Sequence, residues 1–214
     1  MPSTTVMMSI GILVVSFILG IGYFYFISSD DKYLKKKQVE EVTSLLINFV
    51  IYIWLGKIVS NLPKFMSDPL AILAYPSDSK AFYLANIFLI VNIVINMRKM
   101  KRNVSTYLVP FMTVFFSSSL VFEFLLVILD VNTEVSAYIF LLSILLVIHV
   151  LLIGKVNGLK LVSSMMFLWA SGQISLILIN GSTTVFNYTT HILYFIMFIT
   201  CSVYLYLKKE KEVS

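Results

Sequence analysis

The chain has 214 residues, of which 59% are hydrophobic and only 13% charged, and its formal net charge is +5. Soluble domains carry roughly 25% charged residues, so this composition excludes an ordinary soluble domain. The single cysteine, Cys201, excludes an internal disulfide framework and is expected to be a small packed side chain.

Seven apolar runs follow one another along the chain, each close to the roughly 20 residues that a membrane-spanning helix needs. We predict spans at about 5–27, 43–62, 81–97, 106–129, 135–153, 160–179 and 186–207, with a tail at 208–214. The first run is too long for a secretory signal core, and residues 1–8 carry no positive side chain. The prediction is an all-α bundle of about seven transmembrane helices in a single membrane domain.

Most of the basic residues gather in alternate connections between these runs. They are Lys32, Lys35, Lys36, Lys37, Arg98, Lys99, Lys101, Arg102, Lys155, Lys160, Lys208, Lys209 and Lys211. The opposite connections hold Lys64 and Lys80, which nearby acidic residues offset. Because cytoplasmic loops are enriched in Lys and Arg, we predict the N-terminus outside and the tail in the cytoplasm. The same distribution explains the positive charge without a nucleic-acid partner.

The connection at 63–80 contains a short helix signal of its own. Ser67-Asp68-Pro69 is typical of a helix start, with Pro at the first helical position, and Pro76 ends the apolar stretch. The stretch is too short to span a membrane. It predicts an interfacial or re-entrant segment on the outer side, and an exposed coil is the alternative.

Four polar residues are predicted at one depth, roughly 8–9 Å below the outer boundary at 1.5 Å of rise per residue. They are Lys57, Glu123, Gln173 and His191, and each lies in a different span. Since polar groups in spans usually face a bundle interior or an aqueous cavity, they suggest one cavity open to the outer leaflet, with Trp54 as its apolar lining.

Each member also has a simpler interpretation. Lys57 can extend its ammonium to the headgroups, and Glu123 can pair with Lys57 or bond to Ser119 one turn earlier. Gln173 and His191 can be hydrogen-bonding contacts between helices. His149, near the cytoplasmic end of the fifth span, is expected to reach headgroups or helix carbonyls.

No catalytic motif is apparent. The sequence has no histidine and carboxylate pattern at metal-ligand spacing, no Gly-x-Ser-x-Gly elbow and no acidic pair suited to magnesium. Arg98 and Arg102 are the only arginines, and both are predicted to be cytoplasmic. We therefore expect no cofactor, no metal and no catalytic residue of a known type.

One segment resembles a known family. Residues 35–42, 54–57 and 68–73 read Lys-Lys-Lys-Gln-Val-Glu-Glu-Val, Trp-Leu-Gly-Lys and Asp-Pro-Leu-Ala-Ile-Leu. They are similar to the first basic stretch, the Arg-Leu-Gly-Tyr motif and the His-Pro-Leu-x-Ile-Leu segment of bacterial prolipoprotein diacylglyceryl transferase. The resemblance implies a multi-pass protein of the bacterial cytoplasmic membrane that contacts membrane lipids and, in that family, a lipoprotein.

The family's other motifs are missing. Residues 77–82 hold no His-Gly-Gly, and residues 115–123 hold no Gly-Arg-Ile-Gly-Asn-Phe signature. Without these arginines, a leaving phosphate lacks its bidentate donors. The leading hypothesis is a catalytically degenerate relative that binds a lipid, a lipoprotein or another membrane protein. Two alternatives stay open: an active transferase with a rearranged site at Lys57 and His191, and a small-solute transporter or transporter subunit.

Overall fold

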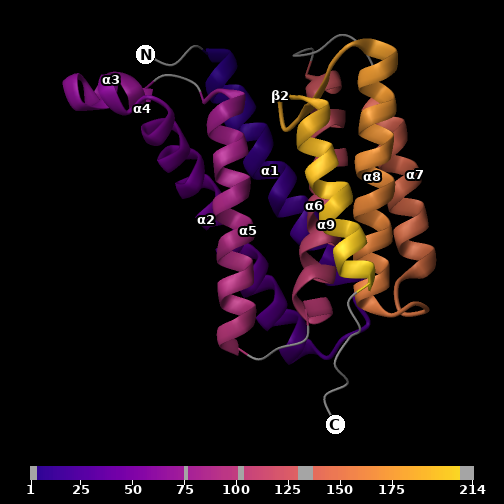
Figure 1. The fold of residues 1–214 in the computed structure, drawn as a ribbon. Helices are drawn as coiled ribbons and strands as arrows, with labels where there is room; N and C mark the ends of the chain where they lie inside the picture. Colours follow the sequence, from indigo (N-terminus) through magenta and orange to yellow (C-terminus); the bar gives the residue numbers. More distant parts are fainter. Residues whose placement is uncertain (1–3, 75–76, 101–103, 130–136, 208–214) are drawn as a thin grey trace.

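The computed structural model describes residues 4–74, 77–100, 104–129 and 137–207. In chain order the elements are α1 (Thr4–Ile27), α2 (Lys32–Ser60), α3 (Leu62–Ser67), α4 (Pro69–Ala74), α5 (Ser79–Met100), α6 (Val104–Ile128), α7 (Ala137–Leu152), α8 (Gly158–Asn180), β1 (Thr183–Val185), β2 (Tyr188–Thr190) and α9 (Ile192–Leu207). The long helices stand side by side in one bundle (Figure 1). The predicted tail at 208–214, Pro76 and the start of the fifth span lie outside the described residues.

Five of these helices are long and apolar enough to cross a membrane, namely α1, α2, α5, α6 and α8. The chain is therefore a helical, multi-pass membrane protein, as its composition predicts. Helices α7 and α9 are equally apolar but have only 16 residues each. At 1.5 Å per residue each is about 24 Å long, somewhat less than a bilayer's hydrocarbon core.

Two helices begin at other residues than the predicted spans. Helix α2 begins at Lys32 rather than near 43, because Lys, Gln and Glu are good helix formers and continue the helix beyond its apolar part. The last helix begins at Ile192 rather than 186, because β1 and β2 form a hairpin before it. The hairpin's strands consist of Thr, Val and Tyr, which favour extended backbone.

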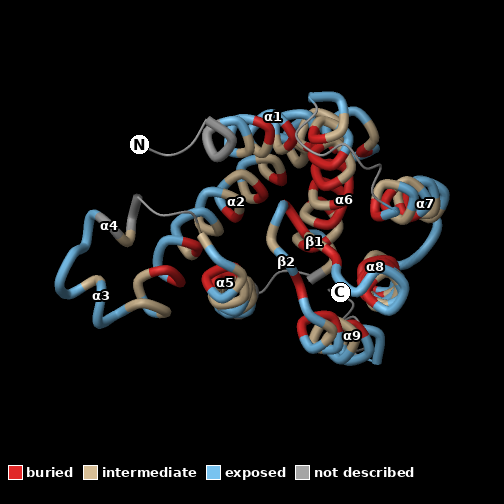
Figure 2. Tube along the Cα trace, turned by 90° about the horizontal axis from the view of Figure 1, so that it is seen from above, coloured by how far each residue is buried: buried red, intermediate tan, exposed pale blue. Residues whose placement is uncertain are grey.

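The helices form two groups, seen from above in Figure 2. One group contains α1, α6, α7, α8 and α9, with α1 packed along α6 and α9 along α8; the other contains α2 and α5. Small residues allow the tightest contacts. A Cβ on Gly56 of α2 would lie 2.6 Å from the carbonyl oxygen of Ala81 on α5, and a Cβ on Gly20 of α1 would collide with Ser118 on α6.

The hairpin lies in the middle of one end of the bundle, among α5, α6, α8 and α9 (Figure 2). We call this the hairpin end. Gly181 ends α8 with a φ of 81°, a left-handed conformation that glycine adopts without strain. The strands pair Thr183 with Thr190 and Val185 with Tyr188, and a two-residue turn joins them.

The segment between α2 and α5 is helical rather than coiled. Helix α4 begins at Pro69, which confirms the helix start predicted from Ser67-Asp68-Pro69. Helices α3 and α4 project sideways from the bundle at the hairpin end (Figures 1 and 2). They expose the large apolar side chains of Leu62, Met66 and Leu70, which fits the predicted interfacial segment.

Candidate functional site in the membrane

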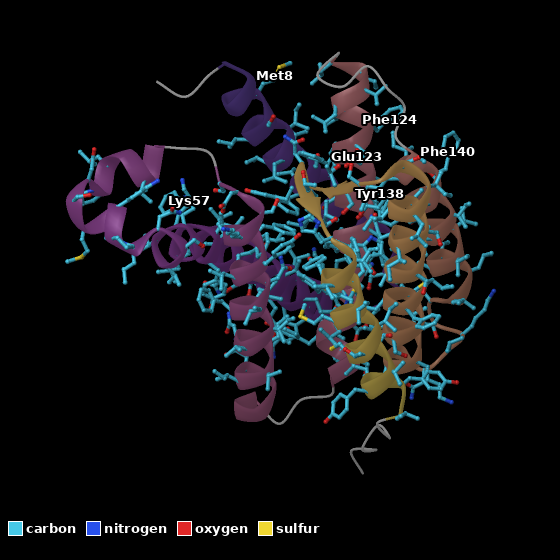
Figure 3. The ribbon with its side chains drawn as sticks, turned by 45° about the horizontal axis from the view of Figure 1, so that its top comes forward. Met8, Lys57, Glu123, Phe124, Tyr138 and Phe140 are labelled. Atoms are coloured by element: carbon cyan, nitrogen blue, oxygen red, sulfur yellow. The ribbon has the colours of Figure 1, made fainter. Side chains whose placement is uncertain are left out.

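Two of the predicted polar residues do meet inside the bundle. Glu123 of α6 and Gln173 of α8 are buried, with 4% and 0% of their surfaces exposed, and both act on the hydroxyl of Tyr138 of α7. Trp169 Nε1 of α8 donates to the same hydroxyl at 3.0 Å. Figure 3 shows Glu123 and Tyr138 close together near the hairpin end. We call Ser119, Glu123, Tyr138 and Gln173 the polar cluster.

Several atoms of the polar cluster lack a hydrogen-bond partner. Ser119 and Gln173 both lie near the Tyr138 hydroxyl. Within the described part of the chain, however, no group forms a hydrogen bond of good geometry with Ser119 Oγ, Gln173 Nε2 or Glu123 Oε1. The remaining amide oxygen of Gln173 accepts from Thr183 Oγ1 of β1 at 2.7 Å. Since a buried polar atom without a partner is costly, this cluster is an unusual feature of a membrane helix bundle.

Lys57 lies elsewhere. It is buried on α2 next to the close contact with α5, and the charge of Asp78, just before α5, acts on it. Figure 3 shows it well apart from Glu123. The prediction that Lys57 and Glu123 share a cavity is therefore wrong. Lys57 is on α2 and Glu123 is on α6, so the two residues belong to different helix groups.

Trp54 and His191 are also placed differently from the prediction. Trp54 is 56% exposed on α2 and is therefore at the surface rather than inside the bundle. His191 is exposed at the start of α9, and its backbone N–H, rather than its ring, donates to Tyr83 Oη at 3.1 Å.

His149 is buried rather than directed to headgroups. Its Nε2 lies 2.8 Å from Thr113 Oγ1 of α6. Thr113 Oγ1 also lies 2.9 Å from the carbonyl oxygen of Val109, and which of Thr113 and His149 donates to the other depends on the tautomer of the imidazole. This hydrogen bond joins α6 to α7.

The sequence did not predict an apolar cavity of about 690 Å³ that lies between the two helix groups. Helices α5, α6 and α9 supply most of its walls, and α1, α2, α8 and the hairpin supply the rest. None of the described residues that line it is charged, and its few polar side chains include Asn86, Tyr194 and Thr200. Cys201 also lines this cavity and is partly buried.

The cavity opens sideways between α5 and α9. Val94 on α5 and Thr200 and Tyr204 on α9 line it and are also exposed, so its mouth lies between these helices. It follows α5 from Phe82 to Val94. Twelve residues of helix correspond to a length of about 18 Å.

The hairpin covers one end of the cavity and connects the two helix groups there. Phe186 at the hairpin turn lines the cavity and packs on Phe17, Phe115 and Phe122, with ring centroids 5.3–5.9 Å apart. On the α5 side, Tyr188 stacks on Phe82 at 4.6 Å, and Tyr83 Oη donates to the carbonyl oxygen of Thr189.

Fold and site together define a helical membrane protein with a laterally open apolar cavity and a buried polar cluster beside it. No family model, curated protein or solved structure matches the chain. The resemblance to prolipoprotein diacylglyceryl transferase stays a prediction. In the described residues no group of three or more His, Cys, Asp or Glu side chains could hold a metal ion.

Proposed function

We propose that this protein binds a membrane lipid by enclosing an acyl chain in the cavity between α5 and α9, without transferring any part of it. The observation that carries the proposal is an apolar cavity with a sideways mouth between two membrane helices. Its volume of about 690 Å³ lies within the range of roughly 300–1,000 Å³ that is usual for small-molecule sites.

The length of the cavity suits a lipid chain. A cavity about 18 Å long matches one leaflet, which is about half of a 30 Å hydrocarbon core.

The proposal includes seven spans, with the N-terminus outside and the C-terminus in the cytoplasm of a bacterial plasma membrane. Helices α7 and α9 stand alongside the five long helices, which supports counting them as spans (Figure 1). In this orientation the hairpin end faces outward. The basic connections predicted to be cytoplasmic then lie at the opposite end.

We further propose that the chain is a catalytically degenerate relative of the diacylglyceryl transferase. Transfer from a phospholipid releases a charged phosphate, which needs cationic donors at the reacting end of the lipid. The described cavity lining offers none, and Lys57 is set apart from it by α5. Thiol-dependent release of glycerol phosphate by the purified protein would reject this part of the proposal and support the active alternative.

The chain-binding site can be tested by filling it. Ile93 of α5 lines the cavity. Ile95 on the same helix is not among the lining residues, and 44% of its surface is exposed. We expect Ile93→Trp to lose most of the lipid that stays bound in native mass spectrometry, and Ile95→Trp to keep it. Equal lipid retention by both variants would contradict the proposed function.

A further inference from the structure

We propose that the polar cluster binds the hydroxyl group of the lipid whose chain fills the cavity, so that the ligand is an uncharged lipid alcohol. This inference rests on the proposed function and names the ligand's chemical class. It starts from the three buried atoms without partners in the described chain, Glu123 Oε1, Ser119 Oγ and Gln173 Nε2.

These atoms complement a hydroxyl. A carboxyl group keeps an acceptor oxygen in either protonation state, and an amide nitrogen donates hydrogen bonds. An alcohol can donate its proton to Glu123 Oε1 while its oxygen accepts from Gln173 Nε2. Their side chains are 4% and 0% exposed, so bulk solvent does not satisfy them.

Trp169 places the polar cluster next to the cavity. Its ring lines the cavity, and its Nε1 donates to Tyr138 Oη at 3.0 Å. The cluster thus lies about one indole ring away from the space for the acyl chain. Phe186 also lies between the cavity and the polar cluster. It lines the cavity and packs on Phe122, which precedes Glu123 in α6.

The charges argue against an anionic lipid. No Lys, Arg or His is among the described residues that line the cavity, so a phosphate would find no cation there. Lys57 lies beyond α5 with Asp78 acting on it. Burying an anionic headgroup without a cation is far more costly than burying a hydroxyl that finds both of its partners.

The chain's single cysteine provides the test. Cys201 lines the cavity, so a bound chain should slow its alkylation by a lipid-soluble maleimide. The protein is placed in phosphatidylcholine nanodiscs with increasing diacylglycerol, its O-acetylated form or phosphatidylglycerol of the same chains. We expect diacylglycerol to protect Cys201 at about tenfold lower mole fraction than the other two. As the control, Val203→Cys in a Cys201→Ser background places the thiol on the exposed face of α9.

Two variants assign the effect to Glu123. Glu123→Met should remove the preference for the free hydroxyl, whereas Glu123→Gln, which keeps an acceptor oxygen, should retain part of it. If acetylated and free diacylglycerol protect equally, the cluster holds water only and this inference is overturned, while chain binding stands. If the three lipids protect Cys201 no more than the control thiol at position 203, the proposed function fails as well.

Discussion

At the residue scale, Phe186 combines an unfavourable backbone with favourable packing. Its φ of 49° and that of Asn187, 68°, are left-handed, and the turn needs two such residues. Asn tolerates this conformation, but for a bulky residue it costs roughly 1–2 kcal/mol. The aromatic rings of α1 and α6 around Phe186 offset that cost, so the side chain rather than the turn sequence holds the hairpin in place.

This balance predicts the effect of truncating Phe186. Phe186→Ala keeps the same backbone penalty but loses the ring, so we expect a loss of about 3 kcal/mol, as for other buried aromatic residues. The measurement is the free energy of unfolding of purified protein in detergent. Phe140→Ala is the matched control, because Phe140 is 64% exposed on α7 and should change little. Similar losses in both variants would show that Phe186 is not an anchor.

At the scale of the elements, two helices pack closely where one of them has a glycine, because glycine has no side chain to keep the backbones apart. A Cβ at Gly56 would lie 2.6 Å from the backbone oxygen of Ala81, whereas a Cβ at Gly22 meets no described atom within 4 Å. Alanine is favoured over glycine inside a helix by up to about 1 kcal/mol. We therefore expect Gly22→Ala to raise the unfolding temperature slightly and Gly56→Ala to lower it, since α2 must move away from α5. Equal shifts would exclude a close α2–α5 contact in the folded protein.

The elements also show where sequence patterns suffice and where they do not. Apolar length alone predicts the bodies of α1, α5, α6 and α8, because a bilayer requires it. The hairpin was missed because Val185, Phe186 and Tyr188 extend the apolar run of α9, and a run of this kind does not distinguish helix from strand. Gly181 and the repeated Thr residues were the available signal for a break in the helix.

At the scale of the whole molecule, the shared cavity of Lys57, Glu123, Gln173 and His191 is predicted only from their depth in the membrane. Depth does not say which helices are neighbours within the membrane plane. It correctly grouped Glu123 with Gln173, whose helices both pack around α7, but it also included Lys57 and His191. Which helices are neighbours depends on contacts such as Gly56 with Ala81, which periodicity does not reveal. The cavity was missed for the same reason, since its lining residues look like any lipid-facing side chains.

The orientation of the whole molecule decides which leaflet the polar cluster faces. Ser182, just after α8, and Lys155, between α7 and α8, are both exposed and lie at opposite ends of the bundle. In a Cys201→Ser background, we expect a membrane-impermeant maleimide to label Ser182→Cys in intact cells and Lys155→Cys only after permeabilisation, because the basic connections face the cytoplasm. The reverse pattern would place the hairpin end in the cytoplasm, and the polar cluster would then lie at the level of the inner leaflet.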